Sequence, residues 1–381
     1  MSISVRPADH GPARKDFLNL PYVIQKGNMQ WAPPLLTQQK ALLDTKKHPF
    51  FANAQIRLFV AYDNNTPVGR IAAINDFKHN RIHAQTTTHF GFFECIDDTK
   101  IATALFEQVE KSALGWGHNM VRGPFNHSVN EEIGLQINAF DTPNFIMIPG
   151  NPPYYETLVK QAGYSGCMDL YCYKLDAGEM RRKLLDSAPK IERRLNITIR
   201  KAQKKTFERD ALKIWEVYNK AWEKNWYWLP ATKDEFMHTV ADLKSIIDYD
   251  LLFLAENQKG ELVGFTVAVP NLNEAIIRLR NGRLLPFGIF KLLWHSRPGA
   301  IKSIRVLVMG VLEQYRGRGI DTVLYHHQYR AALANGYTSG ELSQVLQSNT
   351  MMNRAAELMG GRNYKTHRIY EKQILKPGAG Q

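Results

Sequence analysis

The chain repeats itself at a distance of about 194 residues, and this repeat limits the fold more than any other feature of the sequence. Three short segments of the first half return in the second half in one register, with one residue of drift. They are ISVR at 3–6 and ITIR at 197–200, FVA at 59–61 and FLA at 253–255, and VG at 68–69 and 263–264. Solenoid repeats have periods of ~20–50 residues, so a repeat of this length indicates two duplicated domains.

Each half predicts the same order of elements. The alternating segments ISVRPA and NITIRKA predict an opening strand. A helical stretch follows, clearest at residues 208–224, and then a hairpin whose polar tips lie at 63–66 and 257–260. An apolar strand then runs into a helix, followed by another strand and a final helix–strand unit. The sequence therefore predicts an α+β fold with two domains in tandem, each a mixed, mostly antiparallel sheet flanked by helices.

The predicted boundaries place the first domain at residues 1–178, a basic linker at 179–196 and the second domain at 197–381. Residues 181–205 contain ten Lys or Arg and two acidic residues, in a chain whose formal net charge is +13. Such a run is typical of a solvated helix face, and it also suits contact with phosphate or anionic lipid. The chain has no nucleic-acid recognition motif, so we do not expect nucleic acid as a partner. The sequence does not define an oligomeric state.

Composition and cysteine usage indicate a globular protein of a reducing compartment. Hydrophobic residues make up 44% and charged residues 22% of the chain, which is ordinary for a globular protein. The three cysteines form neither a disulfide framework nor metal-ligand spacing, and we expect no metal. The N-terminal segment lacks an apolar core, and the longest apolar run, 284–294, is shorter than the ~20 residues of a spanning helix. We therefore expect a cytoplasmic protein, at most peripheral to the inner face of the membrane.

A glycine-rich turn joins a predicted strand at 305–312 to a predicted helix at 322–334. Backbone N–H groups at a helix start bind anions, because they lack partners within the helix and lie at the positive end of its dipole. Glycines allow a phosphate to approach the backbone closely, and two arginines in the turn add positive charge. The spacing fits neither a nucleoside-triphosphate loop nor a dinucleotide fold. The alternative is a turn that only closes a strand–helix corner.

This turn resembles the motif V-x-P-x-Y-R-G-x-G-x-G/A of the GNAT acyltransferase family. The matching residues are Val311, Tyr315, Arg316, Gly317, Gly319 and Ile320. Glu313 replaces the proline, and Asp321 replaces the last small residue with a carboxylate that would repel a pyrophosphate unless it turns away. The resemblance implies acetyl-CoA or a longer acyl-CoA as co-substrate. The residues expected to bind it are Met309, Val311, Arg316, Gly317, Arg318, Gly319, Ile320 and Asn349.

The likeness extends along the whole chain. The segments GPFNHSVNEEIG, FDTPNF and NPPYY of the first half, with RGRGID and ELSQVLQSN of the second, are similar to tandem-GNAT proteins of the YghO type, a group that includes bacterial ceramide synthases. The resemblance implies an N-acyltransferase. In the first half, Asp97 and Asp98 stand in place of the glycine turn, and carboxylates at a helix start exclude a phosphate. We therefore expect one acyl-CoA site, in the second half, and a degenerate first copy that shapes the substrate cleft.

Amide formation from a thioester needs a polarised carbonyl and a base. A backbone N–H of the strand segment 308–311 is a candidate for polarising the carbonyl. The candidate bases are Glu341, which lies on the strand after the phosphate helix, and the adjacent Glu131 and Glu132 in a polar loop, with His127 as a further alternative. The residues expected to contact the acceptor are His127, Asn130 and Trp226.

The reaction also needs stabilisation of the departing thiolate. Many GNAT proteins use a tyrosine four residues before the glycine that ends the closing helix, and this chain has Ala356 there. Tyr364 and Tyr370 are the tyrosines nearby, and Tyr364 is the candidate for this role; the alternative is that both are half-buried strand aromatics.

Residues 275–312 contain seven basic side chains, no acidic ones and a dense run of leucine and aromatic residues. This composition suits an element at an anionic membrane or a gate for a lipid chain; the alternative is a covering helix with snorkelling arginines. The expected acceptor is a small-molecule or lipid amine, with a sphingoid base as the example that fits best. The alternative function is an inactive GNAT pair that acts as a binding or regulatory module.

Overall fold

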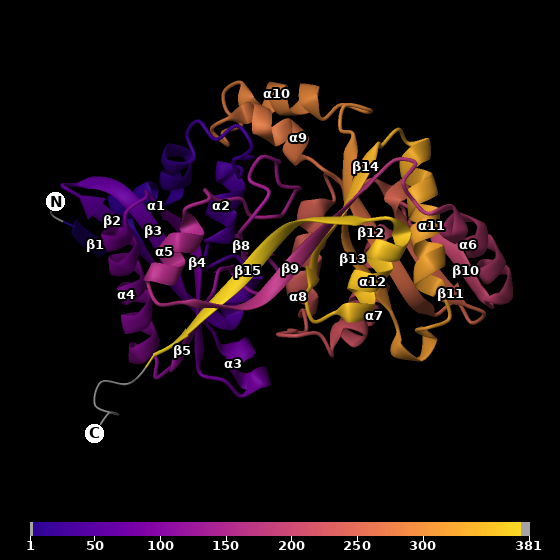
Figure 1. Ribbon diagram of the computed structural model, residues 1–381, viewed down its shortest axis with the longest axis horizontal. Helices are drawn as coiled ribbons and strands as arrows, with labels where there is room; N and C mark the ends of the chain where they lie inside the picture. Colours follow the sequence, from indigo (N-terminus) through magenta and orange to yellow (C-terminus); the bar gives the residue numbers. More distant parts are fainter. Residues whose placement is uncertain (1–2, 375–381) are drawn as a thin grey trace. The chain divides into compact units, whose positions relative to one another are not determined.

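The structure is a computed structural model that describes residues 3–374 (Figure 1). Its described residues form two compact units. The first unit comprises residues 3–170, 273–293 and 365–374, and the second unit comprises residues 171–272 and 294–364. Each unit contains its own group of paired strands with helices packed on them.

The first half of the sequence supplies most of the first unit. Its elements are β1 (Ile3–Pro7), α1 (Gly11–Ile24), α2 (Leu36–Leu42), the 3₁₀ helix η1 (Pro49–Ala52), β2 (Ala54–Asp63), β3 (Thr66–Asp76), α3 (Phe77–His83), β4 (Thr87–Cys95), α4 (Thr99–Gly115), β5 (Met120–Gly123), β6 (Phe125–Asn126), β7 (Glu132–Ile133), β8 (Leu135–Gln136), α5 (Tyr155–Gln161) and β9 (Ser165–Asp176).

The second half repeats the main order, but within residues 3–374 it has a longer insertion between its third and fourth strands and no counterpart of β6–β8. Its elements are α6 (Arg182–Arg194), β10 (Ile197–Lys201), α7 (Phe207–Trp222), α8 (Lys233–Leu243), η2 (Tyr249–Leu251), β11 (Leu252–Asn257), β12 (Leu262–Pro270), α9 (Asn273–Ile276), η3 (Ile277–Leu279), α10 (Gly288–His295), β13 (Ser303–Val311), η4 (Glu313–Tyr315), α11 (Ile320–Ala334), β14 (Ser339–Leu346), α12 (Thr350–Met359) and β15 (Arg362–Gln373).

The strand registers of the two halves agree residue by residue, which confirms the predicted duplication. Ile3 pairs with Asp63 in the first half, and Ile197 pairs with Asn257 in the second, so both partners move by the same number of positions. The register also shifts at the same place in both hairpins, directly after Ala61 and after its counterpart in β11. Bulges fix strand register, so a shared bulge indicates a common local structure.

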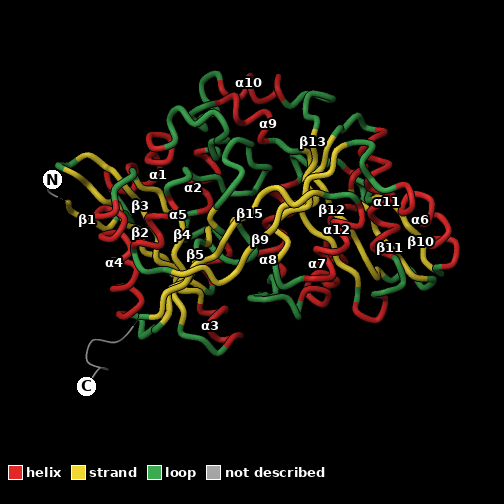
Figure 2. The backbone as a smooth tube through the Cα atoms, in the orientation of Figure 1, coloured by secondary structure: helices red, strands yellow, loops and turns green. Residues whose placement is uncertain are grey.

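In each unit, helices cover both faces of a group of strands that includes one parallel pair. In the first unit, α4 and α5 pack on one face, and α1 and α2 pack on the other, as the alternating side chains of β2 require. Figure 2 shows these helices in red and the strands in yellow. In the second unit, α7 and α8 pack on one face of β11 and β12, and α11 packs on the other. The parallel pairs are β4–β5 and β13–β14.

The last strand of each half runs from one unit into the other. Residues 365–373 of β15 belong to the first unit, where this strand pairs antiparallel with β5 and β8. Residues 171–176 of β9 belong to the second unit, where β9 neighbours β14. The insertion 273–293 also packs with the first unit. Among residues 3–374, no helix combines the length and the hydrophobicity needed to cross a bilayer.

Candidate active site

The two strands of the second unit's parallel pair separate partway along their length. Residues 303–306 of β13 pair with residues 339–342 of β14, and the pairing ends there although both strands continue. The residues of β13 at this point, 306–309, are half-buried, whereas those before them are buried. Strands that part in this way leave a wedge-shaped opening bordered by backbone polar groups, which can hydrogen-bond to a ligand.

In the first unit, the chain itself fills the corresponding opening. The parallel pairing of β4 with β5 covers only residues 87–89 and 120–122. Beyond it, the Asn126 side-chain oxygen accepts a hydrogen bond of 2.7 Å from the backbone N–H of Phe92. The backbone of β6 approaches so closely that a Cβ on Gly91 would lie 1.8 Å from the carbonyl oxygen of Phe125. All nine residues of β4 are buried, so this opening has no room for a ligand.

The helix that follows the parting strand also begins differently in the two units. In the first unit, the Asp98 carboxylate caps α4 and accepts hydrogen bonds from the N–H groups of Lys100 (2.8 Å) and Ile101 (3.2 Å). In the second unit, Gly319 is the N-cap of α11, and no side chain caps the helix start. The anion-binding end of α4 is therefore occupied by a carboxylate, whereas that of α11 has no such cap.

The glycine turn before α11 has the backbone conformation that glycine favours. Gly317 has a φ of +71° and Gly319 a φ of +87°. A Cβ on Gly317 would have nothing within 4 Å, so this side of the turn is open. A Cβ on Gly319 would lie 2.9 Å from a methyl carbon of Ile191, because α6 packs against α11. Arg193 and Arg194, which follow Ile191 on α6, are exposed.

The two arginines of the turn have different surroundings. Arg316 donates hydrogen bonds to the backbone carbonyls of Val311 (3.1 Å) and Ala221, so it ties the turn to the end of α7. Arg318 lies over the ring of Tyr315, 5.4 Å from its centroid, and is exposed. Asp321 lies in the first turn of α11, where a carboxylate favours the helix dipole.

A carboxylate and a phenol meet at the apex of this opening. Glu341 on β14 is aligned with Arg305 on β13, next to the last paired residues, and only 1% of its surface is exposed. The Tyr364 hydroxyl donates a hydrogen bond to the Glu341 carboxylate. Burial, and then the neighbouring carboxylate, raise the pKa of Tyr364 well above its usual value, so the phenol keeps its proton. On the same face, Arg305 donates a hydrogen bond of 3.0 Å to the Ser343 hydroxyl.

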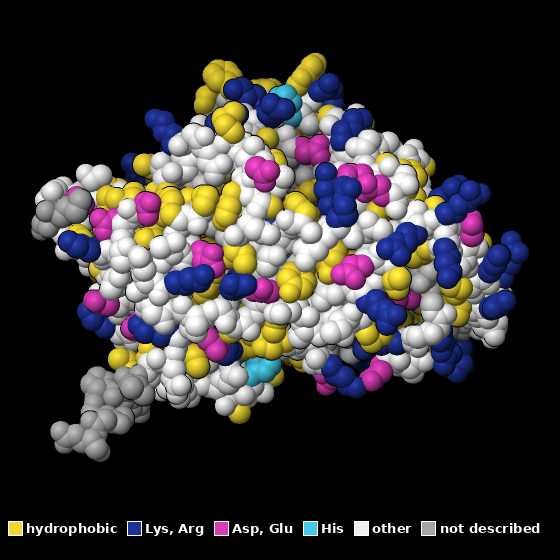
Figure 3. Space-filling view, viewed as in Figure 1, with side chains coloured by type: hydrophobic (Ala, Val, Ile, Leu, Met, Phe, Trp, Pro, Cys, Tyr) yellow, Lys and Arg dark blue, Asp and Glu magenta, His cyan; other side chains and the backbone are white. Residues whose placement is uncertain are grey.

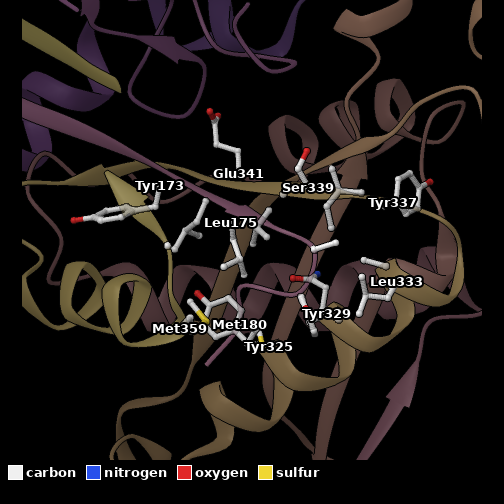
Figure 4. Close-up of a pocket in the computed structure, with 18 of the residues that line it drawn as sticks. Tyr173, Leu175, Met180, Tyr325, Tyr329, Leu333, Tyr337, Ser339, Glu341 and Met359 are labelled. Atoms are coloured by element: carbon white, nitrogen blue, oxygen red, sulfur yellow. The ribbon is translucent and has the colours of Figure 1, made fainter. Parts of the chain in front are cut away.

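The opposite face of β14 borders a mostly apolar pocket. The pocket has about 660 Å³ of empty space, part of it open to solvent. Leucine, methionine and tyrosine side chains from β9, α11 and α12 surround it, and the Glu341 carboxylate points away from them (Figure 4). The residues that define its apolar wall include Tyr173, Leu175, Met180, Tyr325, Leu342 and Met359. One strand thus separates a carboxylate from an apolar pocket.

Ala356, the residue at the family's tyrosine position, lines this pocket. It is buried against Tyr173 and Val345. The Tyr173 hydroxyl donates a hydrogen bond of 3.1 Å to the side-chain oxygen of Asn353, and Tyr325 is buried with its hydroxyl near the sulfur of Met352. Sequence reasoning did not select Tyr173 or Tyr325, because neither lies in a motif and β9 precedes the second half of the sequence.

The other predicted residues of the second unit have varied local contacts. The carbonyl of Met309 accepts a 2.9 Å hydrogen bond from the indole N–H of Trp222, a residue that the predicted site did not include. Asn349 caps α12 by accepting a 3.1 Å hydrogen bond from the N–H of Met352. Trp226 stacks on Tyr227, with ring centroids 4.6 Å apart.

Three predicted site residues lie in the first unit. Glu132 on β7 accepts a hydrogen bond of 3.4 Å from the Asn126 side chain. His127 is fully buried and stacks on Phe50 with ring centroids 4.8 Å apart, and this burial lowers its pKa to about 3. The backbone N–H of Asn130 donates to the Ser128 hydroxyl. These residues shape the loop that fills the first unit's opening.

The structure brings no metal cluster to these sites. Within residues 3–374, no group of three or more His, Cys, Asp or Glu side chains is arranged to hold a metal ion. The arrangement in the second unit instead combines an anion-binding helix start, a parted strand pair and a buried carboxylate.

The chain was also compared with known proteins, and no family model matches it. Over 377 residues it is 33% identical to the bacterial ceramide synthase of Caulobacter vibrioides, and the match covers 98% of both chains. The chain belongs to the family of that protein. Protein YghO of Escherichia coli is another member, 33% identical over 369 residues, or 94% of this chain and 93% of YghO.

Solved structures show which fold this family adopts. The chain resembles a tandem GNAT protein from the clavulanic acid biosynthesis pathway, with a TM-score of 0.59, 11% identity and coverage of 99% of this chain and 100% of the other. A GCN5-related N-acetyltransferase from Sphaerobacter thermophilus has a TM-score of 0.53, 15% identity and coverage of 100% and 98%. The bacterial ceramide synthase and YghO family member described here therefore has a tandem GNAT acyltransferase fold, as its sequence predicts.

Proposed function

We propose that the protein is an acyl-CoA-dependent N-acyltransferase with one active site, in the second unit. The contrast between the two copies carries this proposal. In the second unit, residues 306–309 of β13, at and beyond the last residue paired with β14, are half-buried, and no side chain caps α11. In the first unit, the Asn126 side chain binds the backbone of β4 at this place, and Asp98 caps α4. A duplicated fold that closes one copy and leaves the other open supports a single ligand site.

The CoA part of the co-substrate would bind along β13 and at the glycine turn. Its pyrophosphate would accept hydrogen bonds from the backbone N–H groups at the start of α11, next to the open side of Gly317. Arg318 would supply positive charge, and Arg316 would hold the turn in place through its backbone contacts. The pantetheine arm would follow residues 308–311 into the opening.

At the apex of the opening, the amine nitrogen would attack the thioester carbonyl. Glu341 would accept the proton of the acceptor ammonium, and Tyr364 would favour the ionised carboxylate through its hydrogen bond. A backbone N–H of β13 would stabilise the charge on the carbonyl oxygen. The carbon–nitrogen bond forms, the carbon–sulfur bond breaks, and CoA leaves as a thiolate that takes up the second proton lost by the nitrogen. We assign the base to Glu341 over Glu132 because Glu341 lies in the open copy.

The apolar pocket behind β14 supports an acyl chain longer than acetyl. Its wall carries side chains with no ionised group directed into it, and it adjoins the strand from which Glu341 projects to the other face. Each methylene group moved from water into such a pocket contributes about 0.8 kcal/mol. An acetyl group has no chain to place along this wall, whereas a fatty acyl chain would bury methylene groups against its apolar side chains.

A lipid amine is the acceptor that the comparisons favour. The Caulobacter relative is named a ceramide synthase, and the identity extends over nearly the whole of both chains. A ceramide is the amide of a fatty acid and a sphingoid base, so the same chemistry here would join a fatty acyl group to a long-chain amine.

The test is release of free thiol from acyl-CoA, followed by mass analysis of the amide. Purified protein should turn over a long-chain acyl-CoA with a sphingoid base, and Glu341→Gln should lower kcat by at least 100-fold. The matched Glu132→Gln variant should retain most of the activity. Binding of acyl-CoA without turnover of any amine would favour the alternative, an inactive binding module, which the small residue Ala356 at the tyrosine position supports.

A further inference from the structure

The helix α10 and the loop before it expose an unusual number of large apolar side chains. Leu285 is 79% exposed, Phe287 71%, Phe290 67% and Trp294 65%. Leu293, which shares the helix with Phe290 and Trp294, is also exposed. Single exposed apolar residues are common, but a contiguous group of this size marks an interaction surface.

The apolar face of α10 is exposed, whereas a helix that covers a core buries its apolar face. Phe290, Leu293 and Trp294 stand at positions i, i+3 and i+4, the spacing of one helix face. In α9 and η3, directly before, the apolar residues Ala275, Ile276 and Leu279 are buried. The insertion therefore packs its first part on the protein and turns the apolar face of its second part outward.

The exposed segment is attached to the first unit by specific contacts. The carbonyl of Gly282 accepts a 2.9 Å hydrogen bond from the N–H of Leu36, and a Cβ on Gly282 would lie 2.2 Å from the carbonyl oxygen of Pro34. The Asn273 side chain donates a 2.9 Å hydrogen bond to the carbonyl of Asn144. The outward direction of α10 thus follows from a packed base.

Positive charge accompanies the apolar surface. No acidic residue occurs between Glu274 and Glu313. Lys and Arg side chains lie beside hydrophobic ones over α10 (Figure 3). The exposed basic residues of the segment are Arg278, Arg280, Arg283, Lys291 and Arg297. Arg280 contacts Met29, a further exposed apolar residue, with its guanidinium 3.3 Å from the sulfur, so the surface extends beyond the insertion.

We propose that this surface, residues 278–297 with Met29, docks the protein on an anionic lipid bilayer. Leucine, phenylalanine and tryptophan side chains on one face enter the boundary between headgroups and acyl chains, and surrounding Lys and Arg side chains attract anionic headgroups. The segment has five exposed basic side chains and no acidic one, so a second copy of the chain would place like charges against each other. A protein partner would need both an apolar and a strongly acidic surface. A bilayer supplies both an apolar layer and a dense negative charge, so it matches both features.

This docking is independent of the proposed acyl transfer, and its test measures binding without activity. The full chain is mixed with vesicles of phosphatidylcholine alone or with 30% phosphatidylglycerol, floated on a density gradient, and quantified. We expect binding to the anionic vesicles at low salt, reduced at least tenfold on zwitterionic vesicles. The triple variant Phe290→Ser, Leu293→Ser, Trp294→Ser should bind at least tenfold more weakly. The matched control is Phe77→Ser, Ile82→Ser, which removes exposed apolar residues of α3.

A second variant separates the two contributions. Arg280→Gln, Arg283→Gln, Lys291→Gln should lose binding to anionic vesicles while keeping a melting temperature equal to that of the wild type. Equal flotation of the wild type and the triple serine variant would overturn the proposal. Wild-type protein that binds neither vesicle type would also overturn the proposal. If sedimentation then showed that the wild type is an oligomer and the triple serine variant a monomer, the surface would be an interface between copies of the chain. Thiol release with soluble substrates should be the same in the triple serine variant, which would separate failure of docking from failure of catalysis.

Discussion

The Tyr364 hydroxyl on β15 donates a hydrogen bond to the carboxylate of Glu341 on β14, next to the point where β13 and β14 part. Both side chains are largely removed from water, so this bond lies in a medium where electrostatic effects are strong. The pair is the proposed catalytic centre of the second unit. Its counterpart in the first unit is a loop that fills the opening.

Replacing Tyr364 with phenylalanine removes the donor and keeps the ring. A hydrogen bond to the ionised form of a carboxyl favours that form, so without it the base is protonated at higher pH. We expect kcat to fall about tenfold, and the acid limb of the kcat profile to move to higher pH, while KM for acyl-CoA changes little. A steady-state pH series of both proteins measures this. An unchanged profile would mean that the phenol does not act through the carboxylate.

The open side of the glycine turn can be blocked without disturbing the core. Gly317→Glu places a side chain and a negative charge where the pyrophosphate would lie, so acyl-CoA affinity should fall at least 100-fold by calorimetry. Gly336→Glu is the matched control, because Gly336 also has positive φ (+79°) and open space around its Cβ, at the far end of α11. An equal loss of acyl-CoA affinity in both variants would show that backbone strain alone causes the effect.

A larger side chain at Ala356 should shorten the preferred acyl chain. Ala356 is buried in the pocket wall, so Ala356→Phe would occupy space that a fatty acyl group needs. We expect kcat/KM for a sixteen-carbon acyl-CoA to fall at least tenfold, and kcat/KM for acetyl-CoA to stay within about threefold. A parallel thermal melt separates this from unfolding, since overpacking costs about 1–3 kcal/mol. Loss of both substrates to the same degree in a folded variant would exclude the pocket as the chain site.

Buried histidines should make the first unit sensitive to acid. Burial lowers the pKa of His127 to about 3, whereas an unfolded histidine has a pKa near ~6.5. As pH falls from ~6.5 to ~3, the histidine therefore binds a proton in the unfolded state but not in the folded state. The free energy of unfolding then decreases by up to about 1.4 kcal/mol per pH unit for each such histidine. His79 behaves in the same way, because burial lowers its pKa to about 3 as well.

Urea unfolding at several pH values between 7.5 and 4.5 measures this effect. His127→Phe, which can preserve stacking on Phe50, should reduce the slope of unfolding free energy against pH below ~6 by about 1.4 kcal/mol per unit. His10→Phe, at an exposed position, is the control. A slope in His127→Phe equal to that of the wild type would show that His127 does not titrate on unfolding.

Local sequence patterns predicted much of this molecule. The features predicted correctly each consist of a few adjacent residues, whose local conformation depends mainly on those residues. They are the repeated strand and hairpin segments, the glycine turn, and the adjacent Asp97 and Asp98. The pairing of Ile3 with Asp63 and of Ile197 with Asn257 reproduces the repeat that the sequence displays. Asp98 closes its helix start because its carboxylate is next to the N–H groups it binds.

Features that depend on distant partners could not be predicted. Nothing in the sequence of residues 365–373 indicates that they pair with β5 of the first unit, because the sequence of a strand does not determine which strand it pairs with. The filling of the first opening depends on Gly91 meeting Phe125, 34 positions apart, and Gly91 lies in no recognisable motif. Arg316 was expected to bind the co-substrate, but the backbone carbonyls of Ala221 and Val311 that it contacts are visible only in the folded protein.

The most direct test of the account is a structure of the protein with a non-hydrolysable acyl-CoA analogue. The account predicts one molecule per chain, with its pyrophosphate at residues 317–320, its thioether near Glu341 and its acyl chain in the pocket that Ala356 lines. A molecule bound at Asp98 and the start of α4 in the first unit, or none at the glycine turn, would contradict it.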